Sequence, residues 1–122
     1  KGILTKTVEE SESAKNMGSG TLDVFATPGL VAFVEKTCWM SIDEFIKDDE
    51  TTVGTNMNLD HLKASPIGTK VTCESTLVKQ EDKKLIFEFI VNEGDKVIAK
   101  GLHERFIVNK DKFMSRVYPE KE

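Results

Sequence analysis

The sequence is short of cysteine, of long apolar runs and of positive charge, and each shortage excludes a class of protein. Its 122 residues include two cysteines, Cys38 and Cys73, and both fall in apolar patterns rather than in a C-x-x-C cluster, so a thiolate metal site is not indicated. No stretch approaches the ~18 apolar residues of a membrane span. The net charge of −4 argues against nucleic-acid binding, which depends on clustered lysine and arginine.

The first residues also lack the charged-then-apolar layout of a signal peptide. We therefore expect a cytoplasmic protein whose two thiols stay reduced and lie in the core. Cys38 as a nucleophile is the alternative, although nothing nearby in sequence would activate it. The length, with 39% apolar and 31% charged residues, predicts one globular domain over residues 1–122, and no pattern indicates a metal or a cofactor.

Residues 28–47 have the period of a helix. Thr27 is a suitable N-cap, and Pro28 suits the first helical position, where its missing N–H is not needed. At about 100° per residue, one stripe is expected to face the core: Val31, Val34, Cys38, Ile42, Phe45 and Ile46. A second, largely apolar patch on the far side predicts a helix enclosed by other structure: Leu30, Phe33, Thr37 and Met40.

Glu35 lies inside the first stripe, where a helix should be apolar. A buried carboxylate without a partner is costly, so Glu35 either has a specific partner or lies at the wall of a cavity. The alternative is a carboxylate that reaches solvent at the edge of the stripe.

The rest of the chain has the period of two that is typical of strands. One strand is predicted over residues 2–8, and four follow the helix at 52–61, 69–79, 85–91 and 97–108, the fourth of the five apolar enough to be central. Residues 110–122 form a charged tail with four anchors: Phe113, Met114, Val117 and Tyr118. The predicted fold class is α+β.

Residues 9–20 are polar and end in Met17-Gly18-Ser19-Gly20. Two glycines within three residues predict a mobile or tightly turning segment. It is either a plain surface loop or a lid over whatever Glu35 faces.

One helix and one sheet leave the sheet with open edges and an uncovered outer face. Pairing with a second copy solves both problems, so a homodimer is expected, with a dimer of dimers left open. A long helix wrapped by an antiparallel sheet of about five strands resembles the hotdog fold.

Specific residues then resemble thioesterases of the fluoroacetyl-CoA thioesterase type over about residues 22–117. Thr27, Glu35 and His61 reproduce the family's spacing of eight and then twenty-six residues between its catalytic threonine, glutamate and histidine. Further matching segments are Phe25-Ala26-Thr27 with Val31 and Cys38, Val53-Gly54-Thr55, Ala64-Ser65-Pro66, Gly101-Leu102-His103-Glu104-Arg105 and Lys112-Phe113.

The resemblance implies hydrolysis of an acyl-CoA thioester at a dimer interface by Thr27, Glu35 and His61. Glu35 would be the nucleophile or the base that activates water, and His61 would protonate the leaving thiolate. Thr27 would help to stabilise the oxyanion at the helix N-terminus. Gly54 would line the acyl pocket, since it has no side chain to block the acyl group.

The sequence also offers candidates for other substrate contacts. Met17, Phe25 and Arg105 are candidates for substrate binding; His103 and Arg105 share one strand face and are either structural or in contact with phosphate. Lys63, Lys70 and Lys100 are candidates for the CoA phosphates. The enzyme that names the family has a longer lid with aromatic residues, so only a small or medium acyl group is inferred.

Less specific interpretations stand beside these. Thr27 by itself is most simply a helix cap, and His61 an exposed histidine at a strand end. A hotdog protein that binds an acyl ligand without hydrolysing it is the alternative function, but such a pocket gains nothing from the Glu35 carboxylate. A hotdog hydratase would use an Asp and His pair, which is missing at the matching place.

Overall fold

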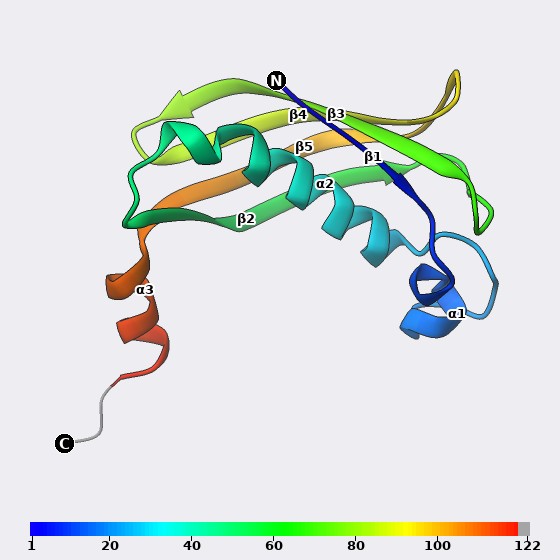
Figure 1. Cartoon of the computed structure of the whole chain (residues 1–122), viewed down its shortest axis with the longest axis horizontal. Helices are drawn as coiled ribbons and strands as arrows, with labels where there is room; N and C mark the ends of the chain where they lie inside the picture. The colour runs from blue at the N-terminus through cyan, green and yellow to red at the C-terminus, as the bar shows by residue number, and fades with distance from the viewer. Residues whose placement is uncertain (120–122) are drawn as a thin grey trace.

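The computed structural model describes residues 1–119, in which one long helix lies across a curved five-stranded sheet (Figure 1). The strand order is β1-β3-β4-β5-β2, and every neighbouring pair is antiparallel. The strands are β1 (Gly2–Thr7), β2 (Glu50–His61), β3 (Lys70–Glu81), β4 (Lys84–Glu93) and β5 (Lys96–Asn109). All five predicted strands are confirmed to within two residues at each end, and β4 is central as expected.

The central helix, α2 (Thr27–Ile42), ends five residues earlier than predicted. A 3-10 turn, η2 (Asp43–Phe45), follows it. Two carboxylates at that point oppose the negative end of the helix dipole, and the last turn has no basic residue to offset them. The predicted continuation of the apolar stripe is therefore wrong at Phe45, whose side chain is 75% exposed.

The buried face of α2 lies between the two predicted patches rather than on the first of them. Val31 is half-buried and Met40 is exposed. Apart from Gly29, the residues that the helix buries come from both patches: Leu30, Phe33, Val34, Thr37, Cys38 and Ile42. Because α2 lies in the hollow of a curved sheet, it buries a wider face than a helix on a flat surface would.

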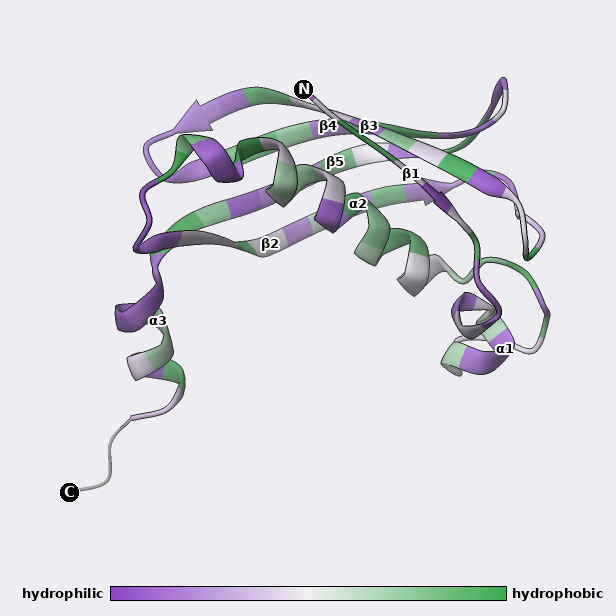
Figure 2. Ribbon diagram, viewed as in Figure 1, coloured by the Kyte–Doolittle hydropathy of each residue, from purple (hydrophilic) through white to green (hydrophobic). Residues whose placement is uncertain are grey.

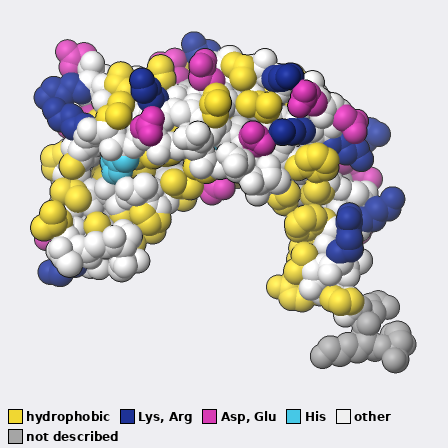
Figure 3. Space-filling model, turned by 180° about the vertical axis from the view of Figure 1, so that it is seen from behind, with side chains coloured by type: hydrophobic (Ala, Val, Ile, Leu, Met, Phe, Trp, Pro, Cys, Tyr) yellow, Lys and Arg dark blue, Asp and Glu magenta, His cyan; other side chains and the backbone are white. Residues whose placement is uncertain are grey.

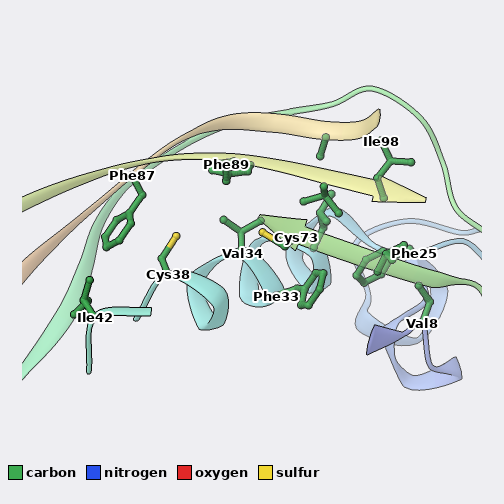
Figure 4. Close-up of a cluster of buried hydrophobic side chains, with 14 of the residues drawn as sticks. Val8, Phe25, Phe33, Val34, Cys38, Ile42, Cys73, Phe87, Phe89 and Ile98 are labelled. Carbon is green, nitrogen blue, oxygen red and sulfur yellow. The ribbon is translucent and has the colours of Figure 1, made fainter. Parts of the chain in front are cut away.

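The core fills the space between α2 and the sheet. Hydrophobic and hydrophilic residues alternate along the strands (Figure 2), and the inward set of β4 is Leu85, Phe87, Phe89 and Val91. Figure 4 shows Phe87, Cys38 and Ile42 at one end of the cluster, and Phe25 and Val8 at the other. Burial raises the pKa of Cys38 to about 12 and that of Cys73 to about 11. Both thiols are core groups, as predicted, and neither is an activated nucleophile.

Glycine allows two strands to approach closely at Gly101. A Cβ atom at that position would lie 1.9 Å from the carbonyl oxygen of Asn58 on β2. No side chain fits there without a shift of the β2 backbone, so the close pairing of β2 with β5 requires glycine at position 101.

The segment between β1 and α2 is more ordered than a plain loop. It contains η1 (Glu10–Glu12) and the short helix α1 (Ala14–Met17), which ends at Gly18 in the left-handed conformation. The N–H of Ala14 donates to the carbonyl of Val24 at 2.9 Å, and the N–H of Ala26 donates to that of Glu12 at 2.9 Å. These bonds attach the segment to the start of α2.

The predicted tail begins with a third helix, α3 (Lys110–Val117), which Asn109 caps by accepting a hydrogen bond from the N–H of Lys112. It leaves the sheet and points away from it (Figure 1). The expected anchors Met114, Val117 and Tyr118 are exposed, so the prediction that they hold the tail to its own chain is wrong. Residues 120–122 of the predicted tail lie outside the described residues.

Candidate active site

Thr27 and His61 form a hydrogen-bonded pair. Thr27 is the first residue of α2 and His61 is the last of β2, and Thr27 Oγ1 lies 2.8 Å from His61 Nδ1. The predicted N-cap is wrong, because Ala26 occupies the N-cap position and the Thr27 hydroxyl is turned to the histidine instead of to the helix backbone. Thr27 therefore sits where the unpaired N–H groups of the first helical turn begin.

Burial lowers the pKa of His61, and a weaker backbone interaction with Lys63 opposes that shift. The neutral imidazole is thus favoured near pH 7. When the Thr27 hydroxyl donates to Nδ1, the ring proton resides on Nε2. His61 Nε2 is buried and has no hydrogen-bond partner among the described residues. The pair can therefore present an unsatisfied N–H to a ligand.

A pocket of about 350 Å³ adjoins the pair. Its walls come from the α1 segment, the start of α2 and the chain after β2: Ala14, Ser19, Val24, Phe25, Ala26, Thr27, Pro28, His61, Leu62, Lys63 and Ala64. Phe25 is buried yet contributes to the wall, and Lys63 is an exposed cation at the same place. A small apolar group with a polar end fits such a lining.

Glu35 lies against Gly54 rather than beside Thr27. A Cβ atom at Gly54 would be 2.8 Å from Glu35 Oε2, so the missing side chain makes room for the carboxylate. Glu35 is half-buried. Gly54 stands where the pairing of β2 with β5 is irregular, between Gly54 and Asn56. The irregularity locally bends the strand edge on which Gly54 lies.

The side chains of His103 and Arg105, from β5, lie next to Gly54, and both are buried. Arg105 donates from Nε to Thr52 Oγ1 at 2.8 Å and from NH2 to the Thr52 carbonyl at 3.0 Å. Its NH1 lies 3.1 Å from His103 Nε2, and His103 Nδ1 lies 2.8 Å from the Asn56 carbonyl. These internal contacts favour the structural interpretation of both residues over contact with phosphate.

Charge links this network to Glu35. Burial lowers the pKa of Arg105, while the Glu35 carboxylate raises it. Burial also lowers the pKa of His103, which keeps the neutral ring favoured next to the arginine. Arg105 and Glu35 therefore interact through their charges beside Gly54.

The three predicted catalytic residues do not meet within one chain. Thr27 and Glu35 are eight residues apart on α2, which corresponds to about 12 Å along the helix axis. Gly54 and His61 are seven residues apart on β2, or about 23 Å along an extended strand. The structure thus has a Thr27–His61 pair and, separately, a Glu35 carboxylate against Gly54.

Met17 is also placed apart from the pair. It lines a different pocket, of about 450 Å³, between β1 and α2, to which Phe33 and Lys36 also contribute. The α1 segment does reach the Thr27–His61 pocket, but through Ala14 and Ser19. Sequence reasoning missed these small residues and also Thr52 and Asn56. Their roles follow from contacts between distant segments, for which no local pattern gives a signal.

Residues 1–119 contain no cluster of three histidine, cysteine, aspartate or glutamate side chains placed to hold a metal ion. In the same part of the chain, every helix is too short or too polar to cross a membrane.

Comparisons of the sequence and of the structure with known proteins both find fluoroacetyl-CoA thioesterases. The sequence profile of the fluoroacetyl-CoA-specific thioesterase family matches residues 8–111. A fluoroacetyl-CoA thioesterase of Streptantibioticus cattleyicolor is 30% identical over 95 residues, which are 78% of this chain and 68% of that protein.

Solved structures agree in fold. A mutant of the fluoroacetyl-CoA-specific thioesterase FlK, in complex with fluoroacetate and CoA, superposes with a TM-score of 0.91 over 96% of both chains at 24% identity. A hot-dog-like protein from Thermanaerovibrio acidaminovorans superposes with a TM-score of 0.86 over 95% of this chain and 86% of its own, at 20% identity. The fold is the predicted hotdog fold.

Proposed function

Because the chain belongs to the fluoroacetyl-CoA-specific thioesterase family and is an acyl-CoA thioester hydrolase, we propose that Thr27, Glu35 and His61 form its catalytic group, assembled between two copies. The observation that supports the assembly is the separation of the Thr27–His61 pair from Glu35 by about 12 Å along α2. A homodimer related by a two-fold axis beside the middle of β2 would bring Gly54 and Glu35 of one copy toward His61 of the other.

Glu35 acts on the thioester carbonyl in this proposal, either as the nucleophile or as the base that activates water. The place between α2 and Gly54 suits both roles, because the carboxylate is half-buried and Gly54 leaves room for it beside the strand. Arg105 acts as a positioning residue, since its guanidinium lies beside Gly54 and interacts through its charge with Glu35.

His61 and Thr27 serve the oxygen and the leaving group. The neutral His61 ring, with its proton on Nε2, donates a hydrogen bond to the developing oxyanion or to the departing CoA thiolate. When Glu35 acts as the base, the proton that it takes from the attacking water is the one that it returns to the thiolate. Thr27 holds the ring through the 2.8 Å hydrogen bond, and the first N–H groups of α2 add positive potential.

The substrate we infer is a CoA thioester with a small or medium acyl group. The pocket of about 350 Å³ beside Thr27 supports a short chain, and exposed Lys63 at that pocket is a candidate contact for the CoA phosphates. Phe25 is proposed as part of the acyl wall. A cytoplasmic location and a single domain over residues 1–122 stay predictions from the sequence, as does a dimer of dimers.

The first experiment measures thiol release from a panel of acyl-CoAs for the parent and for Glu35→Gln. The variant removes the reactive oxygen and nearly preserves the shape, so the rate should fall by about 10²-fold or more. Its melting temperature should stay close to the parental one, because Glu35 is half-buried and glutamine keeps the shape of the side chain. Near-parental activity together with lost stability would make Glu35 a structural residue and the protein a candidate acyl-CoA binder.

The second experiment tests the shared site by mixing two inactive variants, Glu35→Gln and His61→Ala. If each site takes Glu35 from one copy and His61 from the other, the hybrid dimer holds one intact site. Random exchange of subunits should then restore about a quarter of the parental activity. Mixtures that stay inactive, with hybrids verified by mass, would place all three groups of a site in one chain.

A further inference from the structure

The helix α3 presents an apolar face that the described part of the chain hardly covers. Met114 and Val117 are 49% and 52% exposed, and Tyr118, directly after the helix, is 71% exposed. The attachment of the helix lies at its base, where the Lys110 N–H donates to the Asp49 carbonyl at 2.9 Å. An isolated helix of eight residues is not stable in water. Its apolar face therefore needs a surface on which to pack.

The shape of the molecule places that surface outside its own chain. The space-filling view shows a hollow between the body of the molecule and the arm that ends in the undescribed residues (Figure 3). Hydrophobic side chains gather along this arm. Seen as a ribbon, α3 lies at one end of the sheet and α1 at the other, both away from the strands (Figure 1).

The occupant that the fold indicates is a second copy. The sheet ends at β2, a strand of 12 residues whose outer edge pairs with nothing in residues 1–119, whereas the other edge is the six-residue β1. A long open edge is a template for pairing with another chain. Antiparallel pairing of two β2 strands about a two-fold axis places the start of one beside the end of the other. Since Glu50 pairs with Asn109, the base of α3 then lies near His61 of the second copy.

The surface at that position matches α3 in apolarity and in charge. We call it the α1 end, which comprises residues 9–28 and 61–64. Leu22 and Leu62 there are 66% and 55% exposed. The α1 end carries four carboxylates against two lysines: Glu9, Glu10, Glu12 and Asp23 against Lys15 and Lys63. The helix α3 carries three basic groups against one acidic group: Lys110, Lys112, Arg116 and Asp111.

We propose that α3 is an exchanged arm, whose apolar face packs on the α1 end of the second copy and forms an outer wall of that copy's Thr27–His61 pocket. The inference rests on the homodimer of the proposed function, but it adds a contact that the dimer does not require. In this arrangement each copy carries part of the other's acyl site, so dimerisation and the shape of the pocket are linked. It also gives α3 the surface that its helical form needs.

Disulfide trapping between different chains tests the contact. A chain with Val117→Cys is co-expressed with a chain of different tag length that carries Leu62→Cys, and the hybrid is followed during mild oxidation. The matched control replaces Leu62→Cys by Ile90→Cys, which lies at an exposed position on the outer face of β4. Cys38 and Cys73 are buried and do not compete. The hybrid should form at least about tenfold faster with Leu62→Cys than with the control.

Two results of the trapping overturn the proposal. One is equal rates with Leu62→Cys and with Ile90→Cys. The other is a preferred link between two Val117→Cys chains, which would place α3 beside its own symmetry mate. The mixed Glu35→Gln and His61→Ala dimers can regain activity although no Val117 to Leu62 link is preferred. That result would refute the exchanged arm and leave the proposed function intact. A parent chain that is monomeric at micromolar concentration removes both.

A second measurement uses two charge insertions on opposite faces of α3. Val117→Glu places a carboxylate in the apolar face, and Ser115→Glu places one in the polar face. Val117→Glu should raise the dissociation constant of the dimer by at least about tenfold, since an apolar side chain leaves an interface. Ser115→Glu should change it less than about twofold. Equal effects of the two variants contradict the arm.

Discussion

Replacing Gly54 by alanine tests the geometry of the Glu35 site most directly. The added methyl group would lie 2.8 Å from Glu35 Oε2, about 0.6 Å short of the 3.4 Å at which ordinary contact begins, whereas His103 Cε1 at 3.3 Å and Arg105 NH1 at 3.4 Å are nearly clear. The carboxylate is therefore the group that has to move. It sits at the free end of a half-buried side chain, so the shift costs little folding energy.

The expected result is a loss of activity without a loss of stability. A displacement of about 1 Å at a reacting group can cost about 10²-fold in rate, so a shift of about 0.6 Å predicts a fall in kcat/KM of about tenfold or more. Alanine is favoured over glycine in a strand interior by about 0.5–1 kcal/mol, which offsets the contact.

Acyl-CoA hydrolysis and thermal unfolding of Gly54→Ala give both quantities. The neighbouring exposed Thr55→Ala is a matched control and should leave the rate within about twofold. In a Glu35→Gln background, Gly54→Ala should cost little more, because the two changes act on one group. Parental activity in Gly54→Ala, or a full additional loss in the double variant, would refute the placement of Glu35 over Gly54.

Three further predictions concern other parts of the molecule. Gly20→Ala should alter acyl-chain selectivity in the thiol-release assay if residues 9–20 gate entry, whereas Gly18→Ala should also lower the melting temperature, because Gly18 has φ +76°; unchanged selectivity in both returns the segment to a plain surface element. Burial lowers the pKa of His61 and of His103, so the unfolded chain takes up protons near pH 6.5, where the folded chain does not yet do so. The free energy of unfolding should therefore decrease as the pH falls below 6.5. His103→Asn should make this dependence on pH less steep, and an equal dependence in variant and parent would contradict the lowered pKa of His103. Both cysteines should resist a thiol reagent until the protein is unfolded in denaturant, as their raised pKa values and burial require; rapid labelling in buffer would contradict their place in the core.

The strands could be predicted from the sequence because the pattern that defines them is local. Val71, Cys73 and Ser75 alternate with polar residues on β3, and all three are buried. The end of α2 was missed, because an apolar stripe that reaches Phe45 outweighed the acidic pair before it in the prediction. The effects that end a helix act over one turn, whereas the apolar stripe from Val31 to Ile46 extends over about four turns.

The arrangement of the candidate site could not be predicted from the sequence. Spacing along the chain pointed to Thr27, Glu35 and His61, but it cannot indicate that Thr27 turns from its helix to a histidine 34 residues away. The place of Glu35 depends on the irregular register of β2 against β5, which no single segment encodes. The apolar residues of α3 were predicted to pack against their own chain, but they are exposed. An apolar pattern indicates that a side chain packs against another surface, but it does not indicate which surface.

The close approach at Gly101 has a consequence for anyone who reads mutational scans of this protein. A library that replaced every residue in turn would find nearly all substitutions at that position inactive, since even a methyl group collides with the Asn58 carbonyl. Gly101 would then rank with the proposed catalytic residues Glu35 and His61, although it has no chemical group to offer. Substitutions at Gly101 would fail because the backbones of β2 and β5 are too close for a side chain. Sensitivity to substitution alone therefore does not distinguish a residue that allows close packing from one that takes part in the reaction.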